Sequence, residues 1–77
     1  MGNTGYNLKA KGSGFILTVT GGNGSTTIQI TSRGALRDLS GAPIDAGDVR
    51  IAVGALRAAG ETDLAAYVQA WWETKGL

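Results

Sequence analysis

The sequence contains no cysteine and no histidine, and the two absences narrow the chemistry open to it. Without them the usual ligand sets for zinc, copper or haem are missing, and no disulfide can brace the fold. Histidine is also the most frequent general acid or base near neutral pH. The carboxylates Asp38, Glu61 and Glu73 have the pattern of solvated side chains. We therefore expect no metal, no cofactor, no small-molecule substrate and no enzymatic activity.

Long apolar runs are absent as well, since none approaches the roughly 18 residues of a membrane-spanning helix. The N-terminus does not resemble a signal peptide, and the absence of cysteine fits a reducing compartment. These features predict a soluble, cytoplasmic protein with no membrane partner. A chain of 77 residues holds a single core, so we expect one domain, 1–77, with a flexible segment at 1–4.

The formal net charge of +1 is too small for a general nucleic-acid binder, but it is unevenly distributed. Residues 1–40 carry four basic side chains and one acidic side chain, a net +3. Residues 41–77 carry three basic and five acidic side chains, a net −2. Such an asymmetry can orient a partner protein or a second copy of the chain.

Glycine is abundant, with thirteen residues, and it divides the first half into three strand-like segments at 6–12, 14–20 and 25–31. A two-residue turn at 12–13 and a loop at 21–24 set the register, so that opposed positions sum to 25 and to 45. In that register most apolar residues of one face meet apolar residues, as Leu17 meets Leu8 and Ile28. The pattern predicts a three-stranded antiparallel meander with one buried face. The predicted buried residues are Tyr6, Leu8, Ala10, Phe15, Leu17, Val19, Ile28 and Ile30.

After the third strand the periodicity becomes helical. Ser32 is in position to cap a short helix over 33–39, and Asp45 to cap a second helix over 46–59. A third helix is predicted over 62–75. The fold class is therefore α+β, with two or three helices packed on the apolar face of the sheet.

The last helix carries the first candidate binding surface. Trp71 and Trp72 are adjacent, so a helix directs them about 100° apart, and Tyr67 precedes Trp71 by one turn. Two interpretations remain open. Both rings can cover the ends of a small core, or one of them, Trp72 in particular, can anchor a protein contact.

The second candidate surface is the threonine-rich outer face of the sheet, with Ile16 and Gln29 near its centre. Together the two surfaces predict a non-catalytic protein-protein interaction module. It would be a small accessory or inhibitory factor that docks on a larger protein or self-associates as a homodimer. Its size alone is typical of viral and mobile-element products.

The alternative is weak nucleic-acid binding by the basic sheet face. Lys9 and Lys11 lie on that face, and Arg33 and Arg37 would share one side of the short helix. The face has no aromatic ring for base stacking and no arginine on a predicted strand. Two to four phosphate contacts predict weak, salt-sensitive binding.

Overall fold

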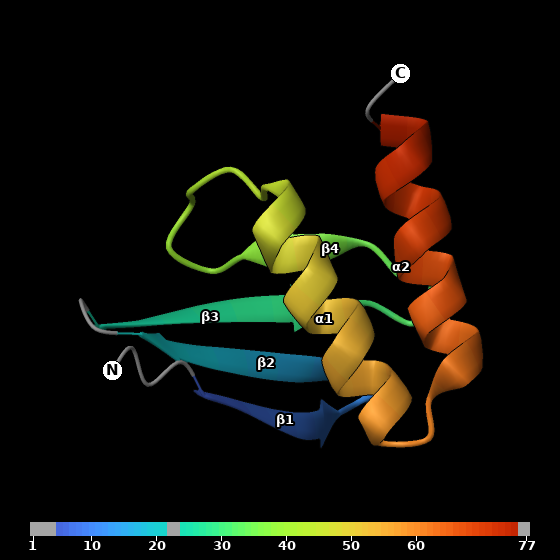
Figure 1. Ribbon diagram of the computed structural model, residues 1–77, viewed down its shortest axis with the longest axis horizontal. Coiled ribbons are helices and arrows are strands. Elements are labelled where there is room, and N and C mark those ends of the chain that lie inside the picture. Colours follow the sequence, from blue (N-terminus) through green and yellow to red (C-terminus); the bar gives the residue numbers. More distant parts are fainter. Residues whose placement is uncertain (1–4, 22–23, 76–77) are drawn as a thin grey trace.

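The fold is an antiparallel sheet followed by two helices, as predicted for the α+β class. The computed structural model describes residues 5–21 and 24–75, and the predicted flexible segment 1–4 lies outside them. The sheet has four strands in the order β1-β2-β3-β4, and Figure 1 shows α1 crossing it with α2 alongside. The element bounds are β1 Gly5–Lys11, β2 Gly14–Gly21, β3 Gly24–Ile30, β4 Leu36–Asp38, α1 Ala46–Ala58 and α2 Thr62–Lys75.

The register of the first three strands is the one that the turns predict. Leu17 lies opposite Leu8 on β1 and opposite Ile28 on β3, and Phe15 lies opposite Ala10 and Ile30. The ladder between β2 and β3 continues by one pair beyond the predicted ends, to residues 21 and 24, without changing register. Alternation along the strands therefore places one set of side chains toward the helices, here called the inner face, and the other set on the outer face.

The predicted short helix over 33–39 is wrong, because this segment turns back and adds a fourth strand. The side-chain oxygen of Thr31 accepts hydrogen bonds from the backbone N–H groups of Arg33 and Ala35, at 3.3 and 3.1 Å. The chain then reverses, and Leu36 pairs with Ile30. These local hydrogen bonds pair backbone N–H groups that would otherwise need a capping residue at the start of a helix.

Gly34 lies at the centre of this reversal and allows the turn to pack directly against the backbone of α2. Its φ of +89° is costly for any residue with a side chain. A Cβ atom at this position would lie 2.5 Å from the carbonyl carbon of Tyr67 and 2.6 Å from the backbone nitrogen of Val68. The backbone of α2 therefore rests directly on the turn, and only glycine allows this approach.

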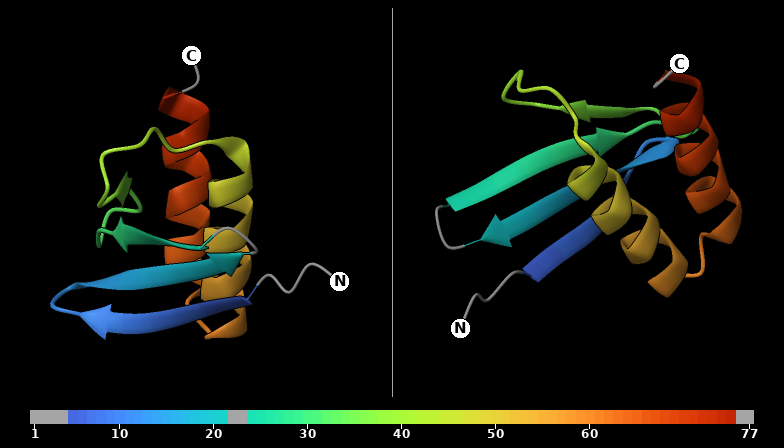
Figure 2. Two further views of the ribbon diagram at one scale, coloured as in Figure 1. Left: turned by 90° about the vertical axis from the view of Figure 1, so that its left-hand side faces the viewer. Right: turned by 45° about the horizontal axis from the view of Figure 1, so that its top comes forward.

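The core lies between the inner face and the two helices, which cover the same side of the sheet (Figure 2). Trp71 and Trp72 are half-buried and pack against this core. The buried apolar residues are Leu17, Ile28, Ile30, Leu36, Val49, Ala52, Val53, Ala55, Leu56, Leu64, Ala65 and Val68. Most of the side chains predicted from strand alternation therefore contribute to one shared core.

The predicted start of α1 is confirmed by a reciprocal capping box. The Asp45 Oδ1 atom accepts a hydrogen bond from the backbone N–H of Asp48 at 2.9 Å, and the Asp48 carboxylate accepts from the backbone N–H of Asp45 at 3.2 Å. Partial burial raises the pKa of Asp48 above its usual value, and the charges of Asp45 and Asp38 add to the effect. The box satisfies donors that a helix N-terminus leaves unpaired.

Two residues of the predicted buried face are exposed. Tyr6 is 51 % exposed and Ala10 is also exposed, although both lie on the inner face of β1. The reason is their position, because β1 is an edge strand and has a neighbour on one side only. Sequence alternation therefore predicts correctly on which face these residues lie, but it does not predict that they are exposed at the edge of the sheet.

Candidate binding surfaces

The outer face of the sheet carries a row of four side chains, one from each strand. Lys9 lies opposite Ile16, Ile16 lies opposite Gln29, and Gln29 lies opposite Arg37. The two ends of the row are cations, and its centre is a half-buried isoleucine beside an exposed amide. Successive strands lie about 4.8 Å apart, so the backbone positions of the two cations are about 14 Å apart.

No acidic side chain lies on this outer face. Lys11 lies two residues from Lys9 and so adds a third cation on the same side. The acidic residue of β4 is on the inner face, and the other five lie before or within the two helices. The acidic residues are Asp38, Asp45, Asp48, Glu61, Asp63 and Glu73. The charge asymmetry between the halves of the sequence thus becomes an asymmetry between the two sides of the molecule.

The predicted relation between Arg33 and Arg37 is wrong. They do not share a helix side, because Arg33 lies in the exposed turn before β4 and Arg37 lies on the strand itself. The expectation that no arginine lies on a strand fails for the same reason. Arg37 joins Gln29 on the outer face, and only the pairing of β4 with β3 reveals it.

Asp38 is 7 % exposed, so the prediction that it is solvated is wrong. Its Oδ1 atom accepts hydrogen bonds from the hydroxyl of Ser40 at 2.6 Å and from the backbone N–H of Ser40 at 2.8 Å. These two bonds hold the pKa of Asp38 below its ordinary value. The residue lies opposite Ile28, so β4, the last strand of the sheet, carries a carboxylate on its inner face.

The aromatic flank of α2 divides into an exposed ring and two half-buried ones. Tyr67 is 54 % exposed, whereas Trp71 and Trp72 contact the core. The two indole centroids are 6.3 Å apart with an angle of 44° between the rings. The Lys75 Nζ atom lies 5.3 Å from the Trp71 centroid, within the range of a cation–π contact. Contact with the core therefore accounts for the partial burial of both tryptophans.

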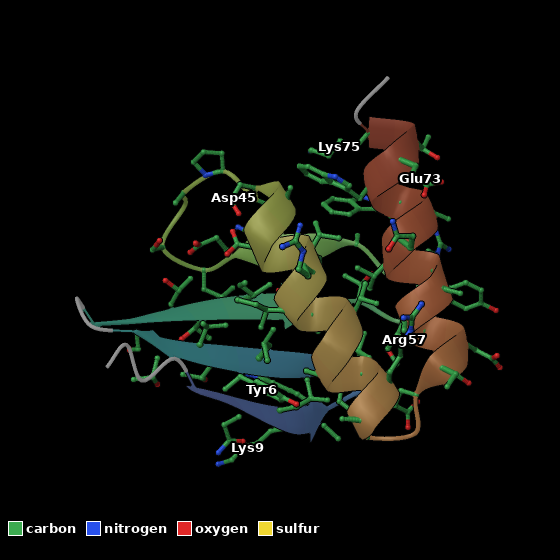
Figure 3. The ribbon with its side chains drawn as sticks, in the orientation of Figure 1. Tyr6, Lys9, Asp45, Arg57, Glu73 and Lys75 are labelled. Carbon is green, nitrogen blue, oxygen red and sulfur yellow. The ribbon has the colours of Figure 1, made fainter. Side chains whose placement is uncertain are left out.

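A shallow groove of about 440 Å³ runs between α1 and α2, and Trp72 forms part of its wall. Its apolar lining comes from Val49, Val53 and Trp72, and polar side chains surround them. The polar lining residues are Arg50, Arg57 and Gln69. Figure 3 shows Arg57 on the side of α1 that faces α2. No sequence pattern predicts this groove, because it depends on how the helices pack.

Among residues 5–21 and 24–75, no three acidic side chains come close enough to hold a metal ion together. None of the helices in these ranges has the length and apolar character needed to span a bilayer. Comparisons with models of protein families, with curated protein sequences and with solved structures find no match. Any inference about function therefore depends on the shape and charge of the surfaces described above.

Proposed function

We propose that the protein is a non-catalytic interaction module that docks on an acidic surface of a larger protein through the outer face of its sheet. The observation that carries the proposal is the row Lys9, Ile16, Gln29 and Arg37, on a face with no carboxylate. Complementary charge speeds association and orients the partners. A module of this kind acts by covering part of its partner, as an accessory or inhibitory factor does.

The composition of the face suits a protein partner. Ile16 provides an apolar centre, and the stems of Lys9 and Arg37 extend apolar surface on either side of it while their charged ends stay in water. An apolar centre with a polar rim is the usual anatomy of a protein interface. Seven-residue strands at about 3.3 Å per residue give a face about 23 Å long. A face of this size is smaller than the roughly 800 Å² per partner of a standard interface, so we expect a weak, transient complex.

The test is recovery of a bound protein from the source cells with two matched variants. Lys9→Glu/Arg37→Glu reverses both ends of the row, and Arg50→Glu/Arg57→Glu makes the same change in net charge at the groove between the helices. We expect the first variant to lose proteins that the native chain and the second variant retain. Circular dichroism checks that both fold. Loss from the second variant alone, or from neither, refutes the proposal.

Nucleic acid remains a second candidate, because Arg37 lies on a strand directly opposite Gln29. Arginine and glutamine are the side chains that make bidentate contacts to guanine and adenine edges. All five aromatic residues lie elsewhere, on the inner face or on α2, so the outer face offers no ring for base stacking. The proposal of a protein partner is favoured for this reason.

The nucleic-acid candidate is tested by fluorescence anisotropy with a labelled duplex and a labelled single strand. With two to four phosphate contacts, the logarithm of the affinity falls with the logarithm of salt concentration with a slope of about −2 to −4. Binding that follows this slope and disappears in Lys9→Glu/Arg37→Glu supports nucleic acid. Absence of binding at about 50 mM salt removes it.

A further inference from the structure

The two edges of the sheet differ in how they are protected. β4 has three residues and an inward carboxylate, Asp38. Short length and inward charge are both means by which proteins prevent an edge from pairing. β1 has seven residues in unbroken register with β2, with no proline and no inward charge. Although β1 carries two lysines on the outer face, it is the longer of the two edge strands in the described part of the chain and has no inward charge, so it is the better suited of the two to pair with another strand.

The register of the first hairpin shows which backbone groups are available at this edge. The two-residue turn makes Lys11 and Gly14 a hydrogen-bonded pair, and such pairs alternate along an antiparallel ladder. The odd-numbered residues of β1 therefore bond to β2. The N–H and C=O groups of Tyr6, Leu8 and Ala10 point away from β2, toward the open edge.

We propose that a second copy of this chain pairs with β1 along this edge, antiparallel and centred on Leu8, to form a symmetric dimer with one continuous sheet. In this register Leu8 meets Leu8 of the other copy, and Tyr6 meets Ala10. Tyr6, Leu8 and Ala10, whose backbone groups point toward the open edge, then all form hydrogen-bonded pairs with the other copy. The inference does not depend on the partner protein proposed above.

The lysines select this register. With Leu8 at the centre, Lys9 lies opposite Asn7 of the other copy, and Lys11 lies opposite Gly5. Sliding the strands by one step toward the turn puts Lys9 opposite Lys9, and the next step puts Lys9 opposite Lys11. Like charges directly opposite each other destabilise an antiparallel pair. The centred register is therefore the one that uses the whole edge without placing lysine against lysine.

The same pairing also covers the two residues that are exposed against expectation. Tyr6 and Ala10 lie on the inner face of β1 and are both exposed. In the dimer the large ring of Tyr6 lies beside the small side chain of Ala10 of the other copy. Figure 3 shows Tyr6 on this strand, with Lys9 pointing away from the helices. The pairing thus places a large side chain where a small one leaves room.

Sedimentation equilibrium of the purified protein, from micromolar to millimolar concentration, measures the dimer dissociation constant. Ala10→Pro removes an outward N–H group without removing a hydrogen bond to β2, so we expect it to abolish the dimer while circular dichroism stays native-like. A native chain that remains monomeric at 1 mM overturns the inference. An unchanged dissociation constant in Ala10→Pro also overturns it.

A second pair of variants tests the register itself. Asn7→Asp places a carboxylate opposite Lys9 of the other copy, and Asn7→Lys places a second cation there. Each dimer contains two such pairs, so we expect Asn7→Asp to tighten it and Asn7→Lys to weaken it by about 2- to 30-fold. Thr18→Asp and Thr18→Lys change the charge equally at the position opposite Asn7 within the chain. Equal effects at residues 7 and 18 overturn the proposed register.

Discussion

Replacing Gly34 by alanine tests whether α2 really rests on the turn before β4. The matched control is Gly41→Ala, because Gly41 has nearly the same φ, +91° against +89°, but has no atom within 4 Å of an added Cβ. At Gly34 the added atom would lie 2.5 to 2.7 Å from atoms of Tyr67 and Val68. The control therefore isolates the backbone strain from the steric overlap.

The expected losses of stability follow from these two contributions. Positive φ costs a residue with a Cβ about 1–2 kcal/mol, and both variants lose this amount. Overlap with α2 adds about 1–3 kcal/mol at Gly34 alone, as in other overpacked sites. Gly34→Ala should therefore cost about 2–5 kcal/mol. That is a large part of the 4–12 kcal/mol or so expected for a domain of this length.

Urea denaturation followed by tryptophan fluorescence measures both free energies of unfolding. The method suits this chain because Trp71 and Trp72 lie on α2, the helix that the substitution displaces. We expect Gly34→Ala to unfold at a clearly lower urea concentration than Gly41→Ala, with similar slopes. Losses that agree within about 0.5 kcal/mol would refute the close packing of α2 on the turn.

Three further predictions concern the buried carboxylate, the N-cap of α1 and a glycine within α1. The lowered pKa of Asp38 means that its carboxylate stabilises the fold above the unfolded pKa of about 3.9 and loses this effect as the pH falls through the folded pKa. The stability gap between the native chain and Asp38→Asn should therefore shrink below about pH 4 in urea titrations, and a constant gap would contradict this. Asp45→Ala should lower the free energy of unfolding by about 1 kcal/mol through loss of the capping box, and an unchanged midpoint would contradict that role. Gly54→Ala should raise the thermal midpoint, by about 0.5–1 kcal/mol in stability, because its added Cβ meets nothing within 4 Å; a lower midpoint would show that the groove needs this glycine.

Much of the fold could be predicted because the signals for the first three strands are local. Alternation sets the register together with two local connections, the turn at 12–13 for Leu8 and Leu17 and the loop at 21–24 for Leu17 and Ile28. The cap at Asp45 is equally local, since its partner is only three residues away. Nothing beyond the immediate neighbours in the sequence was needed for these predictions.

The fourth strand was missed because its cause is tertiary. Leu36 and Leu39 have helical spacing, yet Leu36 is buried and Leu39 is 51 % exposed. The strand forms because Thr31 stabilises a reversal and Gly34 fits against α2, which follows almost thirty residues later in the chain. The same error misplaced Arg37, so only three of the four members of the outer-face row could be predicted.

The difference between the two edges of the sheet limits the number of copies that can assemble by edge pairing. Once two copies have joined through β1, each new outer boundary is a β4 strand of three residues with its carboxylate turned inward. No further chain can be added there in the same way, so growth terminates at a stoichiometry of two. If the dimer forms in this way, we expect no filaments from further edge pairing, even in concentrated solution.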